Sequence, residues 1–255
     1  MRKTNYSELS ALISSHFKPG SATNMFLTSA VLEREAGKGN IYTLSDDSYL
    51  FIFRAHPSHF TLYYYLAPNS LPDFSSFPDN TVCETAMREK DAALVSADRM
   101  LNENGFERLF YRMRMKRAAE IADHSDTEVY SASEDDFVKA RELLHSCFSP
   151  ITGCIPNDDE LHEAVKNSEI LLHRDGGLLH FRNSKVSTEL RHLCVSPESR
   201  GKGIGGELVR AYLSLTKKKS TVWVRSDYEP AKNIYENNGY TPDGTISSVL
   251  YFNKK

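Results

Sequence analysis

The chain has 255 residues, of which 40% are hydrophobic and 25% are charged, and its formal net charge is -3. This length suits one large domain or two small ones that bury a core without disulfides or a structural metal. The small negative charge gives no reason to expect nucleic acid or an anionic membrane as a partner. The start of the chain lacks the apolar run of a signal peptide, and no stretch approaches the length of a membrane span. We therefore expect a cytoplasmic globular protein.

The four cysteines are scattered without a C-x-x-C pair, and the nine histidines form no ligand-spaced cluster with cysteine or carboxylate. We interpret the cysteines as reduced, mostly buried thiols, and we expect no metal site. Cys194 could act as a nucleophile, but a small buried apolar residue is the preferred interpretation.

The first part of the chain has apolar residues at helical spacing, followed by strand-like runs. The expected helices cover residues 6–17 and 22–35, and the expected strands cover 41–44, 49–54 and 60–66. Beyond a loop rich in proline and serine, we expect a strand at 81–85, a helix at 94–104 ended by Gly105, and a strand at 109–115.

A similar series starts again after residue 130. Ser133 as a helix N-cap, and the capping box of Asn157 with Glu160, predict two helices. Strands are expected at 170–173, 178–181 and 188–195, and a helix follows the glycine-rich loop after the last of them. A strand at 221–225, a helix from Pro230 to Gly239 and a strand at 246–252 complete the series.

The two series share a local sequence echo. Residues 97–106 read ADRMLNENGF and residues 231–240 read AKNIYENNGY, and each is followed by a strand-like run with aromatic residues. We interpret the echo as a trace of a tandem repeat. The alternative is that both segments use a common way to end a helix, and different strand orders in the two halves would exclude the repeat.

A strand, a basic glycine-rich loop and a helix follow one another from Glu189 to Tyr212. The first amides of a helix lack helical partners and carry its positive dipole end, so a loop of this kind binds anions such as phosphate. The spacing is not that of a P-loop, because Gly206 is followed by Glu207, and G-x-G-x-x-G is also missing. What is present is Arg-x-x-Gly-x-Gly, from Arg200 to Gly205. The alternative is a tight turn with surface charges.

This stretch resembles the GNAT superfamily of acyl-CoA-dependent N-acyltransferases. The resemblance is specific over residues 189–240, architectural over 131–185 and weak in the first half. It implies an α/β (α+β) fold with a mixed central sheet flanked by helices. Together with the echo, it predicts two tandem GNAT-like domains, a degenerate one at residues 1–125 and a catalytic one at 126–255. The first half lacks the Arg-x-x-Gly-x-Gly loop, so we expect it to bind no CoA.

The resemblance implies acetyl-CoA as the co-substrate, without a metal. The backbone of Leu193, Cys194 and Val195 would pair with the pantetheine arm. The pyrophosphate would lie against the loop formed by Arg200, Gly201, Lys202, Gly203, Ile204, Gly205 and Gly206. One departure is Tyr228, which stands where the family often has an asparagine that touches CoA.

Acyl transfer to an amine needs a base for the amine proton, a polarised carbonyl and a stabilised leaving thiolate. By resemblance, Glu189 occupies the position of the base, and its alternative is a solvated carboxylate at a strand end. His192 is a second candidate base, although a hydrogen-bonded core histidine is the preferred interpretation. Regular strand alternation predicts that His192 lies on the opposite face from Glu189, Leu193 and Val195.

Tyr235 is the candidate general acid, because GNAT members often have a tyrosine four residues before the glycine that ends the last helix. A phenol of pKa about 10 stays protonated beside a thiol of pKa about 8.5, so it can hydrogen-bond the developing thiolate. The alternative is a tyrosine packed on its helix. The first half has Leu101 at the matching position.

We interpret the chain as an N-acetyltransferase that works by direct attack in a ternary complex. Its expected partner is a small-molecule or peptide amine, without nucleic acid or membrane, and a homodimer is compatible with this interpretation. Two alternatives stay open: a non-catalytic acyl-CoA sensor, and a tandem GNAT protein with another acyl donor. The negative charge disfavours an aminoacyl-tRNA donor.

Overall fold

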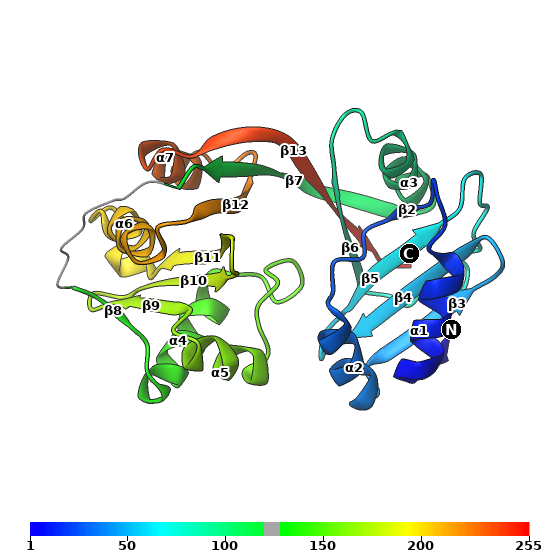
Figure 1. Ribbon diagram of the computed structural model, residues 1–255, viewed down its shortest axis with the longest axis horizontal. Coiled ribbons are helices and arrows are strands. Elements are labelled where there is room, and N and C mark those ends of the chain that lie inside the picture. Colours follow the sequence, from blue (N-terminus) through cyan, green and yellow to red (C-terminus); the bar gives the residue numbers. More distant parts are fainter. Residues whose placement is uncertain (120–127, 255) are drawn as a thin grey trace. The chain divides into compact units, whose positions relative to one another are not determined.

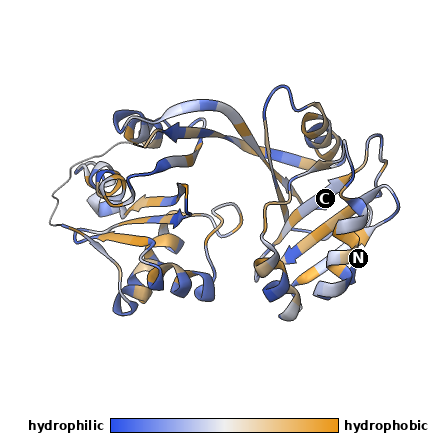
Figure 2. Ribbon diagram, viewed as in Figure 1, coloured by the Kyte–Doolittle hydropathy of each residue, from blue (hydrophilic) through white to orange (hydrophobic). Residues whose placement is uncertain are grey.

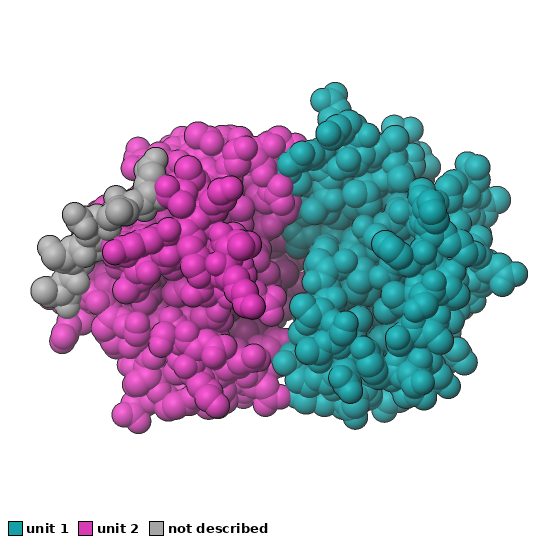
Figure 3. All heavy atoms as spheres, in the orientation of Figure 1, with its two compact units in different colours: residues 1–111, 245–255 teal, residues 112–244 magenta. Residues whose placement is uncertain are grey.

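The computed structural model describes residues 1–119 and 128–254 (Figure 1). The chain divides into two compact units, one of residues 1–111 with 245–255 and one of residues 112–244 (Figure 3). The domain boundary expected between residues 125 and 126 lies outside the described residues. Among those described, no helix combines the length and the apolar character that a membrane span requires.

The first unit is a sheet with helices packed on it. Its elements are β1 (Arg2–Lys3), α1 (Tyr6–His16), β2 (Ala22–Thr23), α2 (Ser29–Gly37), β3 (Ile41–Ser45), β4 (Tyr49–Ala55), β5 (Phe60–Leu66), β6 (Thr81–Met87) and α3 (Ala92–Glu103). The strand β4 is largely hydrophobic along its length (Figure 2), because its alternate residues face two separate cores. Phe51 and Phe53 pack with Leu101 of α3, whereas Leu50 and Ile52 pack with Leu9 of α1. Burial on both faces explains why a continuous apolar run forms this strand.

The second unit is likewise built of paired strands with helices packed on them. Its elements are β8 (Val129–Ser131), α4 (Phe137–Cys147), α5 (Asp158–Lys166), β9 (Ile170–His173), β10 (Gly177–Asn183), β11 (Ser187–Val195), α6 (Ile204–Thr216), β12 (Lys219–Arg225) and α7 (Glu229–Asn237). The capping box predicted at the start of α5 is present, with the Asn157 side chain accepting from the Glu160 amide and the Glu160 side chain accepting from the Asn157 amide. A second capping box joins Ser133 to Asp136.

Two long strands cross the border between the halves of the sequence. β7 (Phe106–Arg117) pairs in antiparallel fashion with β12, through Arg112–Arg117 and Ser220–Arg225. β13 (Thr241–Phe252) pairs in antiparallel fashion with β6, through Ile246–Phe252 and Thr81–Met87. In each unit, a strand from one half of the sequence therefore pairs with a strand from the other half.

The two halves share one strand order. In the first unit, β3, β4 and β5 are neighbours in antiparallel pairs, and β5 is parallel to β6. In the second unit, β9, β10 and β11 are neighbours in antiparallel pairs, and β11 is parallel to β12. A different strand order would have excluded a tandem repeat. The two halves have the same order, so the repeat is not excluded.

One expected element is wrong. A helix was expected over residues 22–35, but α2 begins at Ser29, and Ala22–Thr23 form β2, which pairs with Leu66 and Tyr65 of β5. The helical apolar spacing holds only for the second part of the segment. Pairing with a distant strand overrides local propensity in the first part, as tertiary contacts often do.

Candidate functional site

Strand β11 separates from its neighbour β12 halfway along its length. The parallel ladder between them runs from Ser187–Lys219 to Leu190–Val222. On its other edge β11 stays paired with β10 as far as Val195. The predicted donor-binding residues Leu193, Cys194 and Val195 therefore lie in the part of β11 beyond the end of its ladder with β12.

A β-bulge lies at the same point. The register between β10 and β11 pairs Phe181 with Leu190 but His180 with His192, so Arg191 is the extra residue. Residues that face each other across an antiparallel pair share a face of the sheet.

The bulge changes the phase of the strand. Because Arg182 is opposite Glu189 and His180 is opposite His192, Glu189 and His192 lie on the same face. The prediction that they lie on opposite faces is wrong, since one inserted residue reverses the alternation. Both candidate bases are thus on one side of the sheet.

The basic glycine-rich loop follows β11 directly. It contains a short 3-10 turn (Pro197–Ser199), and α6 begins at Ile204 after Gly203, whose φ of 89° is in the left-handed region that favours glycine. Arg200, Gly201 and Lys202 are exposed. Exposed cations beside the first amides of a 13-residue helix make a suitable anion site.

Helix α6 sits close to both the sheet and α7. A Cβ atom on Gly205 would lie 2.9 Å from Cδ1 of Ile234, and one on Gly177 would lie 2.6 Å from Cγ2 of Ile204. His173 Nε2 is 2.9 Å from Glu207 Oε2, which ties the first turn of α6 to β9. The loop amides are therefore held by a helix whose position is fixed on two sides.

Two cysteines lie next to this loop, and sequence reasoning assigned a possible site role only to Cys194. The Cys147 thiol donates to the Val195 carbonyl at 3.8 Å, and Arg200 Nε donates to the same carbonyl at 3.2 Å. A hydrogen bond with Cys194, together with Ser146 and Arg200, lowers the pKa of Cys147 to about 6 despite its partial burial. The hydrogen bond with Cys147 and burial raise the pKa of Cys194, so Cys194 stays a neutral thiol.

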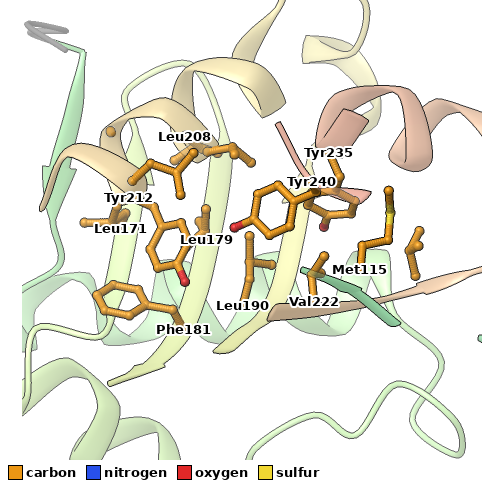
Figure 4. Packing of buried hydrophobic residues seen from close by; sticks show 14 of the residues in the cluster. Met115, Leu171, Leu179, Phe181, Leu190, Leu208, Tyr212, Val222, Tyr235 and Tyr240 are labelled. Carbon is orange, nitrogen blue, oxygen red and sulfur yellow. The ribbon is translucent and has the colours of Figure 1, made fainter. Parts of the chain in front are cut away.

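The candidate catalytic residues have different environments. Glu189 is partly exposed and accepts from Arg191 Nη1 at 3.3 Å. Tyr235, on α7, is only 4% exposed and packs in the core with Val222 and Met115, with its ring 5.7 Å from that of Tyr240 (Figure 4). Burial raises the pKa of Tyr235, so its phenol stays protonated. Such burial also fits the alternative of a packed tyrosine, and its role as an acid stays a prediction.

A histidine pair beneath the loop between α4 and α5 was not identified from the sequence. His180 Nδ1 and His192 Nδ1 are 3.0 Å apart, with nearly parallel rings, and His192 Nε2 is 2.8 Å from the Gly153 carbonyl oxygen. Burial lowers the pKa of His192 to about 4 and that of His180 well below its usual value. No local signal marks His180, because its partner lies 12 residues away on another strand.

Across residues 1–119 and 128–254, no group of three or more His, Cys, Asp or Glu side chains is positioned to hold a metal ion.

Comparison with known proteins gives a family-model match for part of the chain and a fold match for most of it. Residues 161–242 match the sequence model of the acetyltransferase (GNAT) domain. No curated protein matches. A GCN5-related N-acetyltransferase structure from Sphaerobacter thermophilus superposes with a TM-score of 0.58 at 11% identity, over 98% of this chain and 93% of that one. A GNAT-family acetyltransferase structure from Novosphingobium aromaticivorans gives 0.55 at 13% identity, over 83% and 92%.

A third similar structure is a GCN5-related glucosamine N-acetyltransferase region of a fungal multi-domain β-N-acetylglucosaminidase. It gives a TM-score of 0.57 at 13% identity, over 80% of this chain and 31% of that one. Identities this low show the fold alone. The expected fold, a mixed sheet flanked by helices, is confirmed.

Proposed function

We propose that the protein is an acyl-CoA-dependent N-acetyltransferase, because residues 161–242 match the sequence model of the acetyltransferase (GNAT) domain. The single observation that carries the proposal is the site at the end of β11. There, exposed Arg200 and Lys202 flank the first amides of α6, directly beyond a strand that has left its neighbour at Leu190. The amides and cations suit a pyrophosphate, and the strand edge suits the amides of a pantetheine arm.

The reaction we propose is a direct transfer. The amine nitrogen attacks the thioester carbonyl carbon, the new C–N bond forms, and the C–S bond breaks. Glu189 takes the amine proton, directly or through water, and Tyr235 hydrogen-bonds and protonates the leaving thiolate. His192 is less suited to be the base, because its low pKa makes it a weak proton acceptor at neutral pH. The acceptor is an amine on a small molecule or a peptide, and we expect the protein to act in the cytoplasm.

The first test is a calorimetric titration with acetyl-CoA. We expect the wild-type protein to bind it and Arg200→Ala to bind about ten-fold more weakly, because a charged phosphate contact is lost. Arg99→Ala, which removes an exposed arginine from α3 of the first unit, is the matched control. An intact protein that does not bind acetyl-CoA would remove the proposed donor.

A non-catalytic acyl-CoA sensor is the second candidate. Two observations favour it: the side chain of Tyr235 is buried, and the Glu189 carboxylate is paired with Arg191. Neither candidate catalytic group is therefore free to act on a substrate in this arrangement. Release of free CoA in the presence of amines distinguishes the two. A catalyst loses this release in Glu189→Gln, whereas a sensor binds acetyl-CoA and releases no CoA above the rate without protein.

A further inference from the structure

The loop between α4 and α5, residues 148–157, is hydrogen-bonded to two strands of the second unit through two adjacent carbonyls. Arg112 Nη2 donates to the Thr152 oxygen at 2.5 Å, and His192 Nε2 donates to the Gly153 oxygen at 2.8 Å. The loop is compact there, because the Gly153 amide bonds the Ser149 oxygen at 2.8 Å. A Cβ atom on Gly153 would lie 2.6 Å from that same oxygen, so no larger residue fits without moving the backbone.

The two ties come from opposite sides of the opening between β11 and β12. His192 is on β11, beyond the end of the ladder at Leu190. Arg112 is on β7, where it pairs with Arg225 at the far end of β12. The peptide between Thr152 and Gly153 is therefore held from β11 on one side and from β7, the outer neighbour of β12, on the other.

The histidine pair fixes its own tautomers. The Gly153 carbonyl can only accept, so His192 Nε2 carries a proton, and in a neutral ring Nδ1 is then an acceptor. His180 Nδ1 must consequently carry the proton that lies between the two rings. His180 thus holds His192 in the form that donates to the loop, and the ring of Phe148 packs edge-on against His192.

The surroundings of these ties indicate a class of acceptor. Residues 148–156 read FSPITGCIP and carry no charge. The positive charges of Arg112 and Arg191 both act on His192. Glu189 pairs with Arg191, so these two arginines and one carboxylate carry a net single positive charge beside the loop. A positive charge disfavours a polycationic acceptor and favours the neutral, nucleophilic form of an amine.

We propose that His192, oriented by His180, and Arg112 position residues 148–157 across the opening between β11 and β12, where the loop admits amines with a neutral or anionic body and disfavours polycations. The proposal rests on the acetyltransferase function proposed above. His180, His192 and Arg112 are positioning residues here, because they act through the loop.

The test compares His192→Leu, which removes the donor to Gly153, with His192→Gln, which keeps an N–H. We measure hydrogen exchange of residues 148–157, acetyl-CoA affinity by calorimetry, and CoA release with O-phosphoethanolamine, ethanolamine and spermidine. In His192→Leu we expect loop exchange and acceptor KM to rise about ten-fold while acetyl-CoA affinity changes less than about two-fold. His192→Gln should stay close to wild type, and spermidine should be the poorest acceptor.

Several results would overturn the proposal: unchanged loop exchange in His192→Leu, equal damage in His192→Gln, or a preference for spermidine. Should His192→Leu fail to fold, Gly153→Ala displaces the loop without altering β11, and it should raise loop exchange in the same way. If the wild-type protein binds acetyl-CoA but acetylates no amine, the proposed function fails on its own. The exchange of residues 148–157 then decides whether the histidine pair holds the loop.

Discussion

Asn24 donates a hydrogen bond to the carbonyl of Leu62 at 3.1 Å, at the point where β5 and β6 separate. Its Nδ2 also donates to the Glu84 oxygen at 3.0 Å, and its Oδ1 accepts from the Tyr64 amide at 2.8 Å. Beyond this point β2 pairs with the end of β5. In the second unit the corresponding separation, after Leu190, is the proposed donor site. In the first unit, β2 and Asn24 occupy the corresponding gap between β5 and β6.

We predict that Asn24→Ala destabilises the protein by about 2–4 kcal/mol, because the change leaves three backbone groups of a buried site without their partner. Asn24 is only 4% exposed. The measurement is the free energy of unfolding from urea denaturation. Asn233→Ala, at an exposed position of α7, is the control and should change stability by less than about 0.5 kcal/mol. Equal stability of the two variants would contradict a structural role for Asn24.

The filled gap also predicts the stoichiometry of binding. In the first unit β2 pairs with the end of β5, and the first half of the sequence lacks the Arg-x-x-Gly-x-Gly loop, so we expect one acetyl-CoA per chain. Calorimetry of the full chain measures this number. A second binding event that persists in Arg200→Ala would place a donor site in the first unit and refute the prediction.

Tyr235→Phe should reduce turnover about ten-fold or more and leave acetyl-CoA affinity nearly unchanged, because the phenol acts on the leaving thiolate and the ring keeps its packing. Tyr42→Phe, at a partly buried position of β3 in the first unit, is the matched control. If Tyr235→Phe turns over as fast as the wild-type protein, Tyr235 has only a packing role. Water would then protonate the thiolate.

The thiol of Cys147 should be reactive at unusually low pH. Its pKa is lowered to about 6, so the thiolate forms as pH rises through that value. The rate of alkylation by iodoacetamide should therefore rise between about pH 5 and 7 and then level off, since the thiolate is the nucleophile.

Peptide mapping separates Cys147 from Cys154, which is exposed and serves as the internal reference, while Cys83 and Cys194 are buried. A rate at Cys147 that keeps rising to about pH 9, as for an ordinary thiol, would show that its hydrogen bonds do not stabilise the thiolate.

The sequence predicted the parts of the site that depend on neighbouring residues. The strand through Val195, the exposed loop at Arg200 and the helix from Ile204 follow from periodicity, glycine and charge within 30 residues. The capping box of Asn157 with Glu160 is equally local. Such features carry their cause in the adjacent sequence, so they can be read without the fold.

Features that depend on distant partners were missed. Nothing near Arg191 marks a bulge, because a bulge exists only relative to the register with β10. The helix predicted at residues 22–24 does not form, because these residues bond to β5, about 40 residues away. His180 acquires its role only from the ring of His192.

The crossing of β7 and β13 has a consequence for biosynthesis. During translation β6 emerges long before β13, its antiparallel partner, since Thr81 and Phe252 are far apart in the sequence. The growing chain therefore carries an unpaired strand edge while the whole second unit is made, and such edges invite pairing with other chains. We expect ribosome-associated chaperones to matter more for this protein than for one whose halves each complete their own sheet.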